Sequence, residues 1–110
     1  MTLVKVAQTS EIPLRQMRAV KIEEVLIANV NGVYYAIGNI CTHMGGNLSK
    51  GMLEGNTVTC PRHKSKFDVT TGKVVSGPKI PLVHPKIKDE PTYIVKVEGN
   101  DILLEPQQSA

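Results

Sequence analysis

Four residues with metal-ligating side chains constrain this chain more than any other feature of its sequence. Cys41 and His43 form a Cys-x-His segment, and after sixteen further residues Cys60 and His63 form a Cys-x-x-His segment. These four residues include both cysteines of the chain and two of its three histidines. Two thiolates and two imidazoles complete the coordination of a four-ligand metal site. A fold for this chain therefore has to bring two loops together, one from each segment.

Two kinds of metal site are compatible with this ligand set. One is a tetrahedral zinc ion with mixed ligands. The other is a [2Fe-2S] cluster in which cysteines bind one iron and histidines bind the other. A zinc finger takes its two cysteines from one turn and its two histidines from another, whereas each segment here supplies one of each. This pairing suits two metals with different ligands better than one metal with four.

Short apolar segments separated by glycine, asparagine and proline predict an all-β fold, an antiparallel sandwich or barrel. Asn31-Gly32 lies between two apolar runs and is the strongest hairpin signal in the chain. Gly51 to Gly55 predicts a turn, and four prolines in residues 76–91 predict an irregular segment. The predicted strands are residues 3–7, 20–22, 25–30, 33–37, 57–59, 67–69, 73–75, 92–97 and 102–105.

Length and composition narrow the class of protein. The 110 residues fit a single domain, residues 1–110. No apolar run approaches the length of about 18 residues that a transmembrane helix needs, and the N-terminus lacks the charged and then apolar pattern of a signal peptide. Cysteines beside histidines favour metal ligation in a reducing compartment over a disulfide. We therefore expect a cytoplasmic protein without a membrane anchor.

The charge of the chain bears on its partners. The formal net charge is +3, and the chain has one Phe and no Trp. This basicity is too weak and too scattered to predict nucleic-acid binding. It is compatible with docking to an acidic protein, and equally with a charge that only keeps the protein soluble. Arg62, Lys64 and Lys66 surround His63 in sequence, so they are either a docking rim or ordinary solvated side chains.

The two ligand segments and their flanks resemble the Rieske family. Residues 41–46 (CTHMGG) and 60–68 (CPRHKSKFD) are similar to its two cluster-binding loops, and residues 76–78 (SGP) resemble the proline-bearing loop that covers the cluster. The resemblance implies antiparallel sheets with a small cluster-binding subdomain, at approximately residues 38–80, inserted between strands. It also implies one [2Fe-2S] cluster, with Cys41 and Cys60 on the inner iron and His43 and His63 on the outer iron.

Departures from the Rieske pattern indicate the redox range. Gly46 and Arg62 stand where high-potential respiratory members carry two further cysteines joined as a disulfide. Ser65 matches one of their two hydroxyl donors to cluster sulfur, but Phe67 replaces the tyrosine that supplies the other. Such hydrogen bonds raise the reduction potential. We therefore expect a potential in the lower part of the Rieske range of about −150 to +300 mV.

The resemblance implies an electron carrier and not an enzyme, and we predict no catalytic residue. The carrier would take one electron from a flavin-dependent NAD(P)H reductase and pass it to a terminal oxygenase, such as an aromatic-ring-hydroxylating dioxygenase. We expect a monomer or a weak oligomer. Two alternatives remain open from the sequence: the Rieske-like small subunit of a larger redox enzyme such as nitrite reductase, and a structural zinc module.

Overall fold

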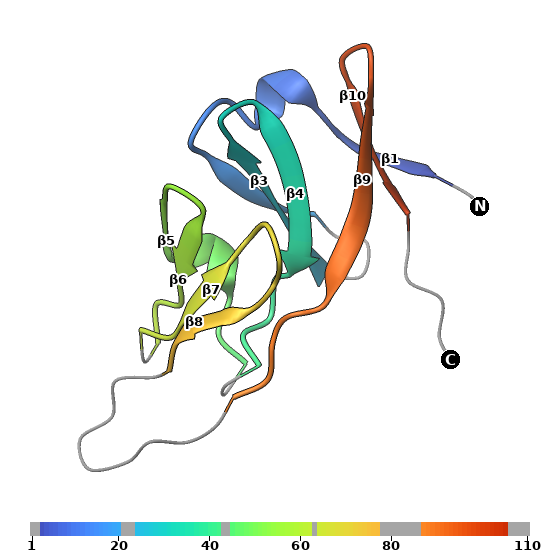
Figure 1. The fold of residues 1–110 in the computed structure, drawn as a ribbon. Coiled ribbons are helices and arrows are strands. Elements are labelled where there is room, and N and C mark those ends of the chain that lie inside the picture. The colour runs from blue at the N-terminus through green and yellow to red at the C-terminus, as the bar shows by residue number, and fades with distance from the viewer. Residues whose placement is uncertain (1–2, 21–23, 43–44, 63, 78–86, 106–110) are drawn as a thin grey trace.

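Ten strands form two antiparallel sheets in the computed structural model, which describes residues 3–20, 24–42, 45–62, 64–77 and 87–105. The larger sheet has six strands in the order β1-β10-β9-β4-β3-β2, and the smaller sheet has four in the order β5-β6-β7-β8. The smaller sheet is inserted between β4 and β9 in the chain and lies beside the lower ends of β3 and β4 in Figure 1. Its position confirms an antiparallel all-β fold with an inserted part.

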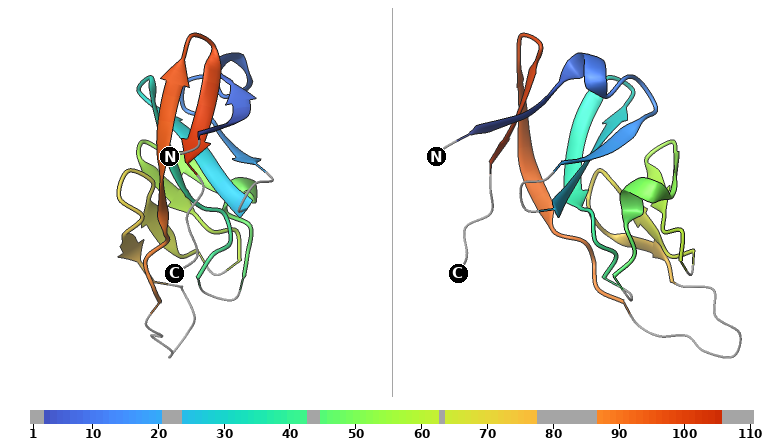
Figure 2. Two further views of the ribbon diagram at one scale, coloured as in Figure 1. Left: turned by 90° about the vertical axis from the view of Figure 1, so that its right-hand side faces the viewer. Right: turned by 180° about the vertical axis from the view of Figure 1, so that it is seen from behind.

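The strands of the larger sheet are β1 (Val4–Gln8), β2 (Met17–Val20), β3 (Val25–Val30), β4 (Val33–Gly38), β9 (Thr92–Glu98) and β10 (Asp101–Glu105). Those of the smaller sheet are β5 (Met52–Glu54), β6 (Thr57–Thr59), β7 (Lys66–Asp68) and β8 (Val74–Ser76). The short 3₁₀ turn η1 (Thr9–Glu11) follows β1, and the short 3₁₀ turn η3 (Leu48–Lys50) precedes β5. The view from behind in Figure 2 shows the β9–β10 hairpin and the smaller sheet on opposite sides of β3 and β4.

The hairpin predicted at Asn31-Gly32 is confirmed. Val30 pairs with Val33 across the turn, and the pairing continues to Val25 and Gly38. Asn31 and Gly32 both have positive φ, 53° and 89°. These are the values that a two-residue hairpin turn requires, and asparagine and glycine adopt them at the least cost. The hairpin delivers the chain to the first ligand segment directly after β4.

Strand β3 is buried on both faces because each face contacts a different core. Successive side chains of a strand point to opposite faces of the sheet. Leu26 and Ala28 join the core between the two sheets, whereas Val25 and Ile27 join the core inside the larger sheet. This division explains why the run is continuously apolar instead of alternating.

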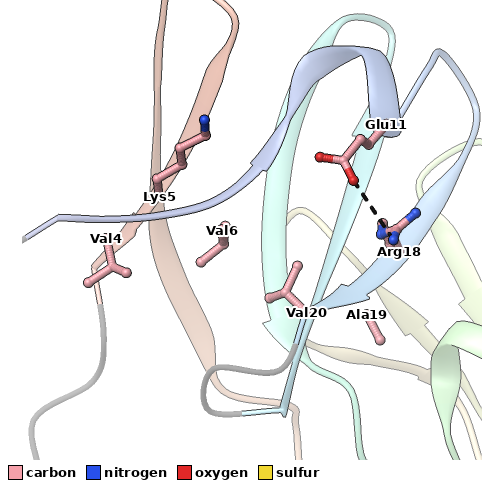
Figure 3. A pocket seen from close by; sticks show the side chains of 7 residues that line it. All are labelled: Val4, Lys5, Val6, Glu11, Arg18, Ala19 and Val20. Carbon is pink, nitrogen blue, oxygen red and sulfur yellow. Dashed lines mark ion pairs between the residues drawn. The ribbon is translucent and has the colours of Figure 1, made fainter.

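The larger sheet leaves a gap between its two edge strands, β1 and β2. A cavity of about 370 Å³ lies there, and Figure 3 shows the side chains that β1, η1 and β2 contribute to it. Val6 and Val20 line it from the two edges, and the ion pair between Glu11 and Arg18, 3.8 Å apart, lies at one end. The larger sheet is therefore an open barrel, and its opening lies at β1, η1 and β2.

The structure differs from the sequence prediction at residues 51–55. Met52 to Glu54 form strand β5, paired with β6, where the glycines predicted only a turn. Of the segment 76–91 that was predicted to be irregular, Ser76 belongs to strand β8, residues 78–86 lie outside the described residues, and residues 77 and 87–91 belong to no strand. Part of the strand predicted at 20–22 lies outside the described residues. Among the residues that are described, no helix is both long and apolar enough to cross a membrane.

Candidate metal centre

The first ligand loop runs from the end of β4 to η3 and closes on itself through its backbone. The Cys41 N–H donates to the Gly46 carbonyl at 2.7 Å, and the Gly45 N–H donates to the Cys41 carbonyl at 3.1 Å. One step further out, Ile40 pairs with Asn47 in an isolated antiparallel bridge. These contacts fold the segment into a tight loop that holds Cys41 at its base.

The buried side chain of Asn39 fixes the position of this loop. Its Oδ1 accepts the Ser49 N–H at 2.9 Å, and its backbone carbonyl accepts the Leu48 N–H at 2.8 Å. Leu48 itself is fully buried in the core between the sheets. The asparagine therefore joins the start of the loop to η3, which follows it.

The second ligand loop connects β6 to β7. The Cys60 N–H donates to the Ser65 carbonyl at 2.8 Å, which closes a short loop over residues 60–65. Within it, Lys64 has a φ of 65°, in the left-handed region that non-glycine residues seldom occupy. Such strain persists where the surrounding structure imposes it, most often at functional sites. The pairing of β6 with β7 thus forces the chain to reverse sharply just after His63.

Both cysteine side chains are buried in the core between the two sheets. Cys41 and Cys60 are 2% and 1% exposed and belong to the same core cluster, with Leu48, Val58 and Phe67. Both are thiols and neither is half of a disulfide. The other two predicted ligands, His43 and His63, lie outside the described residues, as do Met44, Pro78 and His84.

The residues present fit a bulky sulfur-rich group at this place. A side-chain carbon added at Gly46 would lie 2.9 Å from Cys60 Sγ, so glycine is what lets the first loop approach the second cysteine. Ser65 is 1% exposed, and its Oγ has no hydrogen-bond partner among the described residues. A buried hydroxyl without a partner is costly in a finished protein. A cluster sulfur beside Cys60 would supply the missing acceptor.

Basic side chains surround the second ligand loop. A cavity of about 130 Å³ is lined by Cys60 together with Lys50, Met52 and Lys64. Arg62 and Lys64 are exposed, whereas Lys66 is half-buried in β7. The larger cavity, between β1 and β2, is lined by residues from a different part of the chain.

Sequence reasoning did not find Glu90, which lies next to the first loop. Its Oε2 accepts the Thr42 N–H at 2.9 Å, and Thr42 lies between the predicted ligands Cys41 and His43. Burial raises the pKa of the Glu90 carboxyl to about 7, while the hydrogen bond from Thr42 acts in the opposite direction. The contact joins residues 48 positions apart, and no local pattern in the proline-rich segment predicts it.

Comparisons with known proteins agree with this site. The chain matches the family model described as Rieske [2Fe-2S] domain over residues 2–86. It is 37% identical over 103 residues to the ferredoxin component of naphthalene 1,2-dioxygenase/salicylate 5-hydroxylase systems of a Ralstonia species, covering 92% of each chain. It is 34% identical over 110 residues to the ferredoxin component of biphenyl 2,3-dioxygenase of Rhodococcus jostii (strain RHA1), covering 96% of this chain and 94% of that one.

The fold agrees as well. The ferredoxin of carbazole 1,9a-dioxygenase from Nocardioides aromaticivorans IC177 superposes with a TM-score of 0.80 at 31% identity, covering 97% of this chain and all of that one. The comparisons confirm the predicted Rieske resemblance, the fold class and the [2Fe-2S] cofactor. The chain therefore belongs to the Rieske [2Fe-2S] domain family and, within it, to the ferredoxins, which carry electrons and are not themselves catalysts.

Proposed function

We propose that Cys41, His43, Cys60 and His63 hold one [2Fe-2S] cluster. The observation that carries this proposal is the burial of two thiols from two separate loops in one core, where a side-chain carbon at Gly46 would lie 2.9 Å from Cys60 Sγ. Each loop also contains one of the two histidines, close in sequence to its cysteine. When bound, the cluster supplies a one-electron couple whose imidazole ligands place its potential above that of all-cysteine ferredoxins.

The chain itself contributes the surroundings of that couple. The core between the two sheets keeps water away from the thiol side, through fully buried Leu48, Val58 and Phe67. The backbone hydrogen bonds of the two loops hold the main chain of Cys41 and Cys60 in place. The Ser65 hydroxyl is buried without a partner among the described residues and is available as a hydrogen-bond donor to sulfur.

Spectroscopy of the anaerobically purified protein tests the ligand assignment. We expect a red-brown protein that, after dithionite, gives a paramagnetic resonance signal with an average g below the free-electron value. Changing either histidine to cysteine should raise that average toward the value of an all-cysteine cluster, because the ligands set the electronic structure of the iron. A colourless, silent protein with stoichiometric zinc would overturn the assignment in favour of a structural zinc module.

The physiological partners belong to the same proposal. The chain accepts one electron from a flavin-dependent NAD(P)H reductase and delivers it to the terminal oxygenase of an aromatic-ring-hydroxylating dioxygenase system, in the cytoplasm. The relatives in the Ralstonia species and in Rhodococcus jostii are named as ferredoxin components of such systems, which supports this choice. Two cysteines that are not joined as a disulfide suit a reducing compartment.

Reconstituted turnover tests the partners. A reductase and an oxygenase from a naphthalene dioxygenase system, mixed with this protein and NADH, should form product at a rate proportional to the concentration of the added protein. A Cys60→Ser variant, which loses a proposed ligand, serves as the matched control and should give no product. If the protein instead co-elutes from cell extract with a large redox enzyme and never supports the oxygenase, it is a fixed subunit and not a carrier.

The rim of the second ligand loop is the proposed docking surface. Arg62 and Lys64 are exposed there, and Lys50 and Met52 line the cavity beside Cys60. A positive rim favours an acidic partner and speeds the encounter at low salt. Lys64→Gln should slow reduction of the oxygenase and weaken the salt dependence of the rate. Lys96→Gln, on β9 and paired with Glu98, is the matched control and should leave both unchanged.

The domain organisation is also proposed. Residues 1–110 form a single domain in which residues from about 38 to 80 make the cluster-binding subdomain. The insertion of the four-stranded sheet between β4 and β9 supports these bounds, since both ligand loops lie within the same stretch.

A further inference from the structure

Glu90 is a buried carboxyl that none of the roles above uses. It lies in the segment 87–91, just before β9, and is 4% exposed. Its Oε2 accepts the Thr42 N–H, and the Thr42 hydroxyl donates in turn to the Lys88 carbonyl. Figure 1 shows this segment, in orange, running beside the first ligand loop. Two hydrogen bonds therefore connect the loop to one short stretch of chain.

Packing holds the Glu90 carboxyl in a single place. A side-chain carbon at Gly38 would lie 2.6 Å from Glu90 Oε1, so the absence of a side chain at the end of β4 leaves the room that the carboxyl occupies. The Glu90 N–H donates to the Gly72 carbonyl at 2.7 Å, and the Gly38 N–H donates to the Pro91 carbonyl at 3.0 Å. Glu90 and its neighbour Pro91 thus contact β4, the turn before β8 and the first ligand loop.

The charge of this carboxyl is not balanced by an ion pair within the described residues, whose ion pairs are Lys5–Asp101, Arg18–Glu11 and Lys96–Glu98. The charged side chains on the segments packed around it, Lys73, Lys88 and Asp89, are all exposed. An exposed charge is screened by water and salt, whereas a buried one acts through a medium of lower dielectric constant. The carboxylate of Glu90 therefore acts strongly on its near surroundings.

We propose that Glu90 is a positioning residue for the first ligand loop and that its carboxylate lowers the reduction potential of the cluster held there. The proposal rests on the ligand set given under Proposed function. Glu90 acts through the peptide group between two ligands, and it places a negative charge next to the site that an electron must enter. Outer residues that orient ligands commonly affect metal affinity and potential in this way.

Two substitutions that each remove one negative charge distinguish the effect of the buried Glu90 carboxylate on the reduction potential from the effect of any nearby change in charge. Glu90→Gln keeps an oxygen for the Thr42 N–H but removes the charge. Asp89→Asn removes an equal charge one residue away, from an exposed side chain that likewise accepts a backbone N–H, that of Val74. At a pH well above the pKa of Glu90, we expect Glu90→Gln to raise the midpoint potential of the holoprotein several times more than Asp89→Asn does.

A third variant tests the positioning role. Glu90→Ala removes the acceptor of the Thr42 N–H and should speed the loss of the visible cluster absorbance by about 10-fold or more, the range typical of outer-residue substitutions at metal sites. Glu90→Gln should lose the cluster much more slowly than Glu90→Ala, because it restores the hydrogen bond. If Glu90→Ala does not fold, the comparison of Glu90→Gln with Asp89→Asn still decides whether the charge of Glu90 affects the midpoint potential.

The outcomes distinguish this inference from the proposed function. Equal potential shifts in Glu90→Gln and Asp89→Asn would overturn the electrostatic role of Glu90. Cluster loss in Glu90→Ala at the rate of the unmodified protein would overturn its positioning role. An unmodified protein that assembles no mixed-ligand cluster would instead overturn the proposed function, and that is seen before any variant is compared.

Discussion

At the scale of single residues, the buried hydroxyl of Ser65 is expected to tune the reduction potential of the cluster. This hydroxyl is buried without a partner among the described residues, and the Ser65 carbonyl accepts the Cys60 N–H in the same loop. A hydrogen bond to sulfur that is worth about 1 kcal/mol more after reduction corresponds to about 40 mV of potential. We expect Ser65→Ala to lower the midpoint potential by about that amount, as measured by a dye-mediated redox titration. An unchanged potential would mean that the hydroxyl does not contact the cluster.

Gly46 is required by space and not by backbone conformation. We expect Gly46→Ala to reduce the cluster content of the purified protein by about 10-fold, because its new methyl group would collide with Cys60 Sγ. Gly99→Ala is the control. Gly99 has a φ of 59° but has open space around it, so the substitution adds strain of about 1 kcal/mol far from the cluster. Iron and sulfide per chain are the measurement, and equal contents in the two variants would contradict the steric argument.

Glu90 makes stability depend on pH. Burial raises the pKa of its carboxyl from 4.5, the value expected for the unfolded chain, to about 7 in the folded protein. Between these values the unfolded chain releases a proton that the folded chain keeps, so the stability contributed by protonated Glu90 is full below about pH 4.5 and is lost as pH rises to about 7. The loss amounts to about 3 kcal/mol. The melting temperature of the unmodified protein should therefore fall relative to that of Glu90→Gln across this window, and a constant difference would exclude the shift.

At the scale of elements, pairing with a neighbouring strand decides whether a three-residue segment such as β5 forms a strand. Met52 to Glu54 lie between two glycines and show too little alternation of apolar and polar residues to predict a strand. In the structure they nevertheless pair with β6, with Glu54 opposite Thr57, Leu53 opposite Val58 and Met52 opposite Thr59. By contrast, β3 and β4 are six residues each and flank a turn with an unambiguous signature, so their pairing was predictable. A strand this short is stabilised mainly by its neighbour, because its own side chains bury little surface.

The smaller sheet is anchored by the core that it shares with the larger one. Val58, on β6, is fully buried there, whereas Val75, on β8, is 56% exposed. Val58→Ala should destabilise the protein by about 2 kcal/mol through lost burial and a residual cavity, and Val75→Ala by well under 1 kcal/mol. Thermal unfolding of the two holoproteins followed by circular dichroism is the measurement. Similar losses in both would show that this core does not support the sheet.

For the whole molecule, the two separate cores predict that the two sheets differ in their stability against local unfolding. The core inside the larger sheet contains neither cysteine, whereas the core between the sheets contains both. Removal of the cluster should therefore speed amide hydrogen exchange in β5 to β8 and the two loops while β3, β4, β9 and β10 keep most of their protection. Uniform loss of protection would contradict the proposed subdomain of residues from about 38 to 80.

The sequence by itself determined the all-β class and the β3–β4 hairpin, and it predicted the four candidate ligands. Each of these follows from local chemistry: residue type, spacing of a few positions, or a turn that only certain residues adopt. Only the tertiary structure decided that a side chain at Gly46 would collide with Cys60 Sγ, that the Ser65 hydroxyl is buried, and that the Glu90 carboxyl accepts the Thr42 N–H. These contacts join segments far apart in the chain, and their energies depend on burial, which exists only after the two sheets have packed together.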